Sequence, residues 1–411
     1  MPRKELAAQV STLPYDIYTD KESRKIIAGN PHTFLRIVRS ECTMPKGTNP
    51  YGDDVYEKAR ELLEDDIKGG VLAEESQECY YIYRQVMNDR SQTGIVGCFA
   101  VDDYLNNVIK KHELTRKDKE SDRTKHIDIC GAQTGMVFMA FQDKYSPAQL
   151  IEEITKREPL YDFRAIDGVR QMVWRVSDAA EIACITESFA KTPSLYIADG
   201  HHRCASAAVV ALKKRIDNPK YNGDEEFNYI LAVAFPQDEL VIYPYNRLMK
   251  DLNGLSDEEF LSALPKRGFT VKKVSKEFTA AEKERGTYKT MKKGEIAVYL
   301  SGSWYRITAD PRIMKDDPVG CLESSLLQDN IMGPLLGVKD IRTDERVDFV
   351  GGIRCFEEIE ERCNDDMKVG FALYPTSMAE LFRITDEGLI MPPKSTWFEP
   401  KLQSGLFIHR I

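Results

Sequence analysis

Apolar residues recur along this chain with two spacings, and each spacing predicts a different kind of element. Residues 54–68 carry apolar side chains three or four positions apart, which predicts a helix that ends at Gly69-Gly70. Short runs of apolar, aromatic or β-branched residues predict strands at 80–86, 93–101, 136–141, 171–176, 194–198, 229–235, 240–244 and 369–374. Of these, we expect the strands at 229–235 and 240–244 to pair as a hairpin.

Helices and strands mix along the chain without strict alternation, which predicts an α+β fold with mixed sheets. Further helices are expected at 179–190 and 204–215, and Thr376-Ser377 has the composition of a capped helix start. Four segments are expected. They are an N-terminal α/β segment (1–90), a central core (91–250), a small α+β insertion with a helix at 280–285 (251–312), and a C-terminal α/β segment that closes over the core (313–411).

Composition places the chain among ordinary globular proteins. Of its 411 residues, 42% are hydrophobic and 30% charged, and this length is enough for two or three domains. The net charge of −9 argues against binding nucleic acid through the overall field of the protein. Nine cysteines without a C-x-x-C pair exclude zinc-ribbon and redox spacings, and they fit the reduced thiols of a cytoplasmic protein.

The sequence offers no candidate for membrane insertion. The first residues form no apolar signal-peptide core, and no run of about 18 apolar residues occurs. We therefore expect a cytoplasmic protein without a membrane partner. No sequence feature specifies an oligomeric state.

The densest group of reactive side chains is Asp-Gly-His-His-Arg at 199–203, where a predicted strand turns into a predicted helix. Gly200 allows a ligand to approach the backbone, and the N-terminus of a helix favours anions. Arg203 adds a planar fork that fits phosphate or carboxylate. The motif therefore predicts a phosphate-handling site. The simpler alternative is a helix start whose N–H groups are capped by Asp199.

His112-Glu113 is a second candidate, because a carboxylate beside a histidine can act as a general base. The alternative is a surface dyad. Zinc is a competing function for the histidines, with His112, His201, His202 and Cys204 as ligands. No H-E-x-x-H pattern supports it, and adjacent histidines are awkward ligands for one metal.

Lys394-Ser395-Thr396 and Lys401 form a third candidate. Prolines flank these residues, so hydroxyl and ammonium groups stand on a rigid segment that suits contact with phosphate. The alternative is a proline-stiffened surface tail. No Walker A loop, no G-x-G-x-x-G fingerprint and no G-x-S-x-G elbow is present anywhere.

Taken in order, these motifs resemble the family catalogued as domain of unknown function 1015, over nearly the whole chain. The residues that carry the resemblance are Pro14-Tyr15-Asp16, Asn30-Pro31, Phe34-Leu35, Lys111-His112-Glu113, Thr115, Asp122-Arg123, Asp199-Gly200-His201-His202-Arg203, Leu326-Leu327, Gly333-Pro334-Leu335-Leu336-Gly337, Pro392-Pro393-Lys394-Ser395-Thr396-Trp397-Phe398, Pro400-Lys401 and Ser404-Gly405.

The resemblance implies a ParB/sulfiredoxin-like core that binds a nucleotide at the D-G-H-H-R turn. It also implies kinship with free-serine kinases, which transfer a phosphoryl group from ADP or ATP to L-serine. The resemblance implies that Glu113 is the general base that deprotonates the acceptor hydroxyl. It also implies that Asp199 holds Mg²⁺ or helps to position the acceptor molecule. His202 takes part in catalysis. The remaining contacts to the nucleotide are expected from Gly200, His201, His202, Arg203, His112, Lys394, Ser395, Thr396 and Lys401.

Two positions depart from the family pattern. Cys204 stands where an aromatic residue is expected, and Asn246 stands where the family more often has the histidine of a His-Arg pair. Two alternatives to a kinase follow. One is a ParB-like nucleotide-binding regulator without transfer chemistry, and the other is a sulfiredoxin-like protein with Cys204 as its reactive thiol. Catalysis by Glu113 requires it to lie within about 10 Å of the turn, because one bound substrate must reach both at hydrogen-bond distance.

Overall fold

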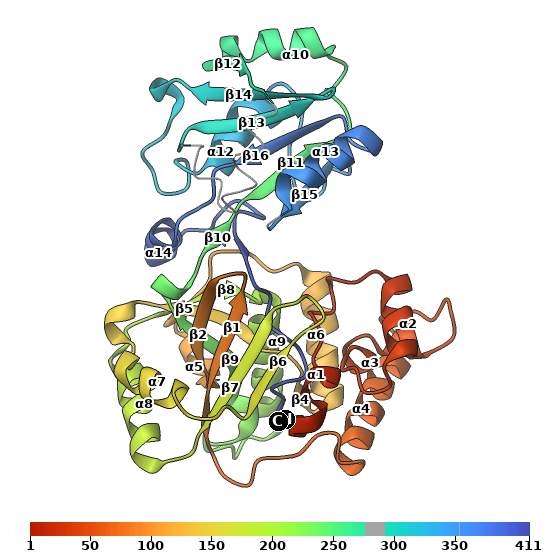
Figure 1. Ribbon diagram of the computed structural model, residues 1–411, viewed down its shortest axis with the longest axis vertical. Helices are drawn as coiled ribbons and strands as arrows, with labels where there is room; N and C mark the ends of the chain where they lie inside the picture. The colour runs from red at the N-terminus through yellow and green to blue at the C-terminus, as the bar shows by residue number, and fades with distance from the viewer. Residues whose placement is uncertain (276–291, 353) are drawn as a thin grey trace. The chain divides into compact units, whose positions relative to one another are not determined.

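The computed structural model describes residues 1–275, 292–352 and 354–411 (Figure 1). Its contacts divide the chain into two compact units, each treated by itself. The first unit combines Met1–Leu240 with Pro400–Ile411, and the second is Val241–Glu399. The helix expected at 280–285 lies outside the described residues.

A mixed eight-stranded sheet forms the centre of the first unit, with the order β3-β8-β5-β9-β2-β1-β7-β6. The β3–β8 and β5–β9 pairs are parallel and the other five pairs are antiparallel. This mixture confirms the expected α+β class. The strands are β1 (Tyr80–Met87), β2 (Arg90–Ala100), β3 (Ile109–Lys110), β5 (Val137–Phe141), β6 (Tyr161–Arg164), β7 (Arg170–Val176), β8 (Leu195–Asp199) and β9 (Tyr229–Pro236).

Helices complete the first unit by covering apolar positions of this sheet. One core joins β5, β8 and β9 to α9, and a second joins α7 and α8 to β1, β2 and β7. The first four helices gather around a third core near residue 130. The helices are α1 (Ala7–Val10), α2 (Asp20–Gly29), α3 (Leu35–Val38), α4 (Asp53–Lys68), α5 (Val101–Leu105), α6 (Lys117–Cys130), α7 (Ala148–Thr155), α8 (Ala179–Lys191) and α9 (His201–Asp217).

Most local predictions for the first unit are confirmed, and one pairing is wrong. Helix α4 ends at Gly69 as expected, and the strands expected at 80–86 and 93–101 are present as β1 and β2, which pair antiparallel. The hairpin expected between 229–235 and 240–244 does not exist, because both edges of β9 are taken by β2 and β5. All side chains of β9 after Tyr229 are buried, as in a central strand, whereas 242–243 form β10 in the second unit.

The second unit contains a six-stranded antiparallel sheet with an apolar core on each face. Its order is β12-β14-β13-β16-β11-β15, and β10 pairs separately with β17. The strands are β10 (Ile242–Tyr243), β11 (Tyr245–Met249), β12 (Phe269–Lys273), β13 (Glu295–Leu300), β14 (Ser303–Ala309), β15 (Val347–Gly351), β16 (Val369–Leu373) and β17 (Trp397–Phe398). The helices are α10 (Asp257–Ala263), α12 (Glu323–Leu327), α13 (Cys355–Asp365) and α14 (Met378–Asp386).

The two units group the chain differently from the four expected segments. Residues 251–312 supply β12, β13 and β14, and β13 pairs with β16 from the last fifth of the chain. A sheet shared in this way makes them one compact unit with the residues that follow. The capped start of α14 is confirmed, since Ser377 and Glu380 form a reciprocal capping box.

The last twelve residues return to the first unit. Ser404 forms an isolated antiparallel β-bridge with Thr12, and β18 (His409–Arg410) pairs with β4 (Ala132–Gln133). The side-chain amide of Gln85, on β1, donates to the carbonyl oxygen of Lys401 at 2.9 Å. This contact fixes the backbone from which the Lys401 side chain extends. Among the described residues no helix is both long and apolar enough to cross a membrane.

A substitution at Gly94 tests how closely β2 approaches β9. A Cβ atom there would lie 2.8 Å from the carbonyl oxygen of Ala234 and 2.7 Å from the ring of Phe235. Because backbone cannot easily give way, Gly94→Ala should lower the free energy of unfolding in urea by about 1–3 kcal/mol.

Gly29→Ala is the matched control, because nothing lies within 4 Å of the added Cβ at the end of α2. It should leave stability unchanged or raise it by up to about 1 kcal/mol. Equal losses in both variants would contradict the close approach of β2 and β9.

Candidate functional site

The candidate site forms where two parallel strands end. β3 and β8 pair in parallel, with Ile109 opposite Leu195, so the segments that follow them emerge at one edge of the sheet. These segments are 111–116 and 199–203, the two motifs singled out in the sequence. The start of β5 reaches the same edge, because Phe138 pairs with Asp199.

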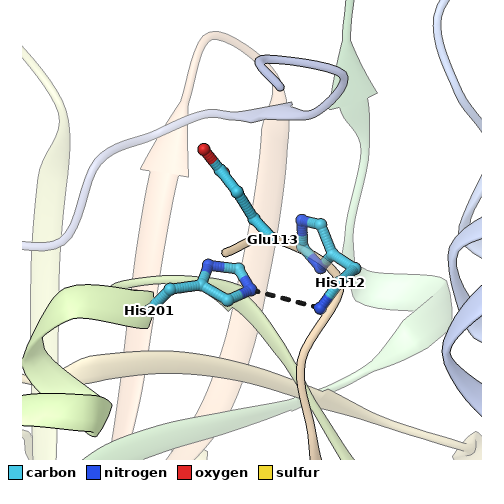
Figure 2. Close-up of side chains that lie close together, drawn as sticks. All are labelled: His112, Glu113 and His201. Atoms are coloured by element: carbon cyan, nitrogen blue, oxygen red, sulfur yellow. Dashed lines mark hydrogen bonds between the residues drawn. The ribbon is translucent and has the colours of Figure 1, made fainter. Parts of the chain in front are cut away.

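His112, Glu113 and His201 form a tight cluster at this edge (Figure 2). Each offers one nitrogen or carboxylate oxygen, and these three atoms lie within 4.8 Å of one another. The backbone N–H of His112 donates to Nε2 of His201 at 3.4 Å, and the two rings meet edge to face at 4.4 Å. Glu113 therefore meets the requirement of lying well within 10 Å of the turn.

Both histidines of the cluster are neutral at pH 7. Burial lowers the pKa of His112 to about 4, against a small opposing effect of its hydrogen bond to the carbonyl of Ile197. Burial, and then the neighbouring His112 ring, lower the pKa of His201 well below its ordinary value. Neutral imidazoles can accept a hydrogen bond, donate one, or bind a metal ion, but they add no positive charge.

Asp199 stays ionised at the end of β8. Burial by itself raises the pKa of Asp199, but the positive charges of Lys401 and Arg203 outweigh it and hold the pKa well below its usual value. The ammonium of Lys401 lies 2.8 Å from one carboxylate oxygen, and half of the Asp199 side chain remains exposed. The sequence alternative of a capping Asp199 is not observed, because its other oxygen accepts from Gly200 and α9 has no side-chain cap.

Gly200 makes the sharp turn into α9. Its φ is +95°, in the left-handed region where a side chain would be strained. The next residues are each held from outside the helix. Nε2 of His202 accepts from the backbone N–H of Arg116 at 3.0 Å, and Arg203 donates to the carbonyl of Met136 at 2.9 Å. Both side chains are therefore held in place by contacts within the protein.

Tyr15 and Arg123 belong to the same neighbourhood, although neither was predicted to be a site residue. The guanidinium of Arg123 lies 4.1 Å from the centre of the Tyr15 ring and pairs with Asp122 at 2.8 Å. Burial raises the pKa of Tyr15, while Arg123 and Arg203 lower it in part, so Arg203 lies close by. The signal that could have identified them was present, since both residues carry the family resemblance.

Cys204 takes no part in this site. It is fully buried in the apolar core beneath α9, and burial raises the pKa of its thiol. A thiol in such surroundings is inert, which removes the argument for a sulfiredoxin-like role of Cys204. Of the four residues considered for zinc, only His112 and His201 belong to the described cluster, and Glu113 joins them.

The donor set allows two kinds of cation. Two neutral imidazoles with one carboxylate suit zinc or a similar transition metal. The half-exposed carboxylate of Asp199 suits Mg²⁺, which prefers oxygen ligands and keeps several waters. The carboxylate of Asp199 therefore fits the expected Mg²⁺. To bind the ion with the oxygen that now contacts Lys401, Asp199 must first release that ammonium group.

The 394–396 segment belongs to the second unit. There Arg247 donates to the carbonyl oxygens of Pro393 and Lys394, and the Ser395 hydroxyl lies 3.0 Å from that of Ser324. Of the third sequence candidate, only Lys401 lies in the first unit, beside Asp199.

The family described as "Protein of unknown function (DUF1015)" matches residues 1–326. The chain belongs to this family. No curated protein matches the chain.

Three solved structures are remotely similar to this DUF1015 protein. A free serine kinase in complex with AMP has 12% identity and a TM-score of 0.35, over 74% of this chain and 86% of its own. A conserved hypothetical protein from Pyrococcus furiosus has 12% identity and a TM-score of 0.36, over 75% and 93%. SbnI with C-terminal truncation from Staphylococcus aureus has 8% identity and a TM-score of 0.40, over 75% and 85%.

The neutral state of His112 can be measured directly. In an NMR titration of the full chain, the His112 ring should titrate with a midpoint near pH 4, because burial disfavours the imidazolium. The ring signal that disappears in the His112→Gln variant is assigned to His112. A midpoint at pH 6 or above would contradict the burial of this ring.

The same burial makes stability depend on pH. The unfolded histidine, with a pKa of about 6.5, binds a proton that the folded one does not. The free energy of unfolding should therefore fall as pH drops from about 6.5 to about 4, by about 1.4 kcal/mol per pH unit for each such histidine. His112→Gln should reduce this slope by that amount in urea unfolding, and an unchanged slope would contradict it.

Proposed function

We propose that this DUF1015 protein is a nucleotide-dependent phosphotransferase that acts on a small hydroxylated metabolite such as L-serine. One observation carries the proposal. The Glu113 carboxylate lies within 4.8 Å of His201, at a glycine turn that starts a long helix without a side-chain cap. A general base and an anion-binding helix start are thus together, which is the minimum that phosphoryl transfer requires.

Each residue of the turn has a distinct role in the proposed reaction. The backbone N–H groups after Gly200 and the guanidinium of Arg203 bind the phosphates, and the rings of the uncharged His201 and of His202 add hydrogen bonds. Preorganised donors of this kind stabilise the charge that moves during transfer. The contacts of His202 to Arg116 and of Arg203 to Met136 support such preorganisation.

Glu113 acts on the acceptor. It takes the proton of the hydroxyl, whose oxygen then forms a bond to the terminal phosphorus of the nucleotide. The bond between that phosphorus and the bridging oxygen breaks, and its electron pair leaves with the shortened nucleotide. Asp199 would hold Mg²⁺, which neutralises phosphate charge when bound. Lys401 competes for the same carboxylate, so it acts as the counter-charge when the cation is absent.

A nucleotide-binding regulator without transfer chemistry is the second candidate. The same turn would bind phosphates, and the observation that favours it is the Lys401–Asp199 ion pair, a contact that a bound nucleotide could break. The two candidates differ in one measurement, because only the transferase forms a phosphorylated product.

Glu113→Gln separates the two candidates. With ATP or ADP, Mg²⁺ and L-serine, the variant should lose about 10²–10⁴-fold in kcat, since general-base catalysis contributes that much. Nucleotide affinity in calorimetry should change less than threefold. Glu158→Gln is the control, because Glu158 is an exposed glutamate of the same unit. Binding without product in the unmodified protein would favour the regulator, and no nucleotide binding would refute both.

Arg203→Lys tests the phosphate contact. It keeps the positive charge but loses the planar fork, so the nucleotide Kd should rise about 10-fold or more, as expected for a lost charge-assisted bidentate contact. Arg175→Lys is the matched control, on the partly exposed surface of β7. Equal affinity in Arg203→Lys and the unmodified protein would remove Arg203 from the site. Urea unfolding of both variants shows whether the Met136 contact matters for stability.

A further inference from the structure

A row of three glutamines crosses the central sheet of the first unit. Gln85 on β1 lies directly opposite Gln92 on β2 and opposite Gln171 on β7, so all three side chains point to the same face of the sheet. Each of them is at most 1% exposed. Glutamines are seldom buried so completely, because each amide then needs hydrogen-bond partners inside the protein.

The amides of the row are joined in one direction. Nε2 of Gln92 donates to Oε1 of Gln85 at 3.0 Å, and Nε2 of Gln85 donates to Oε1 of Gln171 at 3.3 Å. The same Nε2 of Gln85 also donates to the carbonyl oxygen of Lys401 at 2.9 Å. Because a carbonyl oxygen can only accept, this contact fixes which end of the Gln85 amide faces Lys401.

The end of the chain, Pro400–Ile411, covers this face of β1. Tyr81, Tyr83 and Gln85 are alternate residues of the strand and therefore share one face. The Phe407 ring packs edge-on against both tyrosines, with ring centres 5.2 and 5.8 Å apart. Phe407 thus anchors the end of the chain through apolar contact, and Gln85 fixes the backbone of Lys401 by a directed hydrogen bond.

The row is not the most stable way to fill this face. Oε1 of Gln92 is buried and has no hydrogen-bond partner among the described residues, and an unsatisfied buried acceptor is costly. Apolar side chains of similar size would avoid that cost. What the amides add is a donor at a defined point beside the backbone of Lys401.

The position of Lys401 controls access to Asp199. The ammonium of Lys401 lies 2.8 Å from one oxygen of the Asp199 carboxylate, and the lysine side chain is only 14% exposed, whereas half of the Asp199 side chain is exposed. The ammonium therefore occupies an oxygen that a cation would use. Because like charges repel, a divalent cation can use that oxygen only after the ammonium has moved away.

We infer that Gln85, oriented by Gln92 and Gln171, is a positioning residue that places Lys401 as the counter-charge of Asp199 and thereby lowers the affinity of Asp199 for a divalent cation. The inference rests on the proposed function only for the use that the cation has. The hydrogen bonds and the ion pair all lie within the first unit. The ion pair and the bound cation are thus alternative states of one carboxylate.

Acetylation of the full chain tests the positioning. An ammonium beside a carboxylate reacts slowly with acetic anhydride, because only the free amine attacks and the ion pair disfavours it. In Gln85→Leu, Lys401 should be acetylated about fivefold faster by mass spectrometry, in line with the net effect of one hydrogen bond. Lys156 and Lys191, which are 67% and 66% exposed, provide the reference rate.

Gln133→Leu is the matched control, because Gln133 is also a buried glutamine of the first unit, and its amide bonds to the backbone of β9. It should leave the rate at Lys401 unchanged. An unchanged rate in Gln85→Leu, or an equal rise in both variants, would overturn the inference. If Gln85→Leu does not fold, Gln92→Leu takes its place, and the loss of one partner of Gln85 should still speed acetylation of Lys401 about twofold.

Electron paramagnetic resonance with Mn²⁺ tests the effect on the cation, because Mn²⁺ shares the preference of Mg²⁺ for carboxylate oxygens. Lys401→Met should bind Mn²⁺ about 3–5-fold more tightly, since a competing charge is removed. Asp199→Asn should lose the ion, which assigns it to this carboxylate. Gln85→Leu should tighten binding about twofold in the unmodified chain and add nothing in the Lys401→Met variant, a result that general destabilisation would not produce.

Unchanged Mn²⁺ affinity in Lys401→Met, or a further gain from Gln85→Leu in that variant, would contradict the effect on the cation. Neither acetylation nor Mn²⁺ binding depends on phosphoryl transfer. If both behave as expected and no phosphorylated product forms, the proposed transferase fails and the positioning of Lys401 stands.

Discussion

The parallel pairing of β3 with β8 is the constraint on which the candidate site depends. Only two residues of β3 take part, yet they fix where the chain goes next, because both strands end at one edge of the sheet. His112 and Glu113 follow one strand, and Asp199 and the turn follow the other. Met136, the residue before the antiparallel β5, then supplies the carbonyl that holds Arg203. Residues nearly 90 positions apart thus share a site through a few backbone hydrogen bonds.

Charge is distributed differently in the two units. In the first, buried histidines are kept neutral while Asp199 and Lys401 form a partly exposed ion pair, so the charged groups remain within reach of water. In the second, Arg247 is charged and buried, with backbone carbonyls in place of a counter-ion. An ion pair in contact with water costs little and is easily exchanged, whereas a buried cation without a counter-ion is costly.

Much of the local structure could be predicted from the sequence, and the residues of the turn could be singled out. Apolar periodicity identifies α4 and the capping residues identify α14, because these signals act over a few residues. The partners of β9 could not be predicted, since an all-apolar strand fits several neighbours. Nor could the contact of Lys401 with Asp199, which joins residues 202 positions apart and depends on the buried amide of Gln85. Cys204 was given a chemical role by its position in the sequence, and only its burial shows that it is inert.

The return of Pro400–Ile411 to the first unit has a consequence for how the protein is made. The second unit interrupts the first in the sequence, so the first unit cannot be complete when residue 240 leaves the ribosome. At about 5–20 residues per second, the second unit delays Lys401 by on the order of ten seconds or more. During that interval Asp199 lacks its counter-charge and β4 lacks the strand that pairs with it. The nascent chain thus acquires the ion pair of its candidate site only after the second unit has been made.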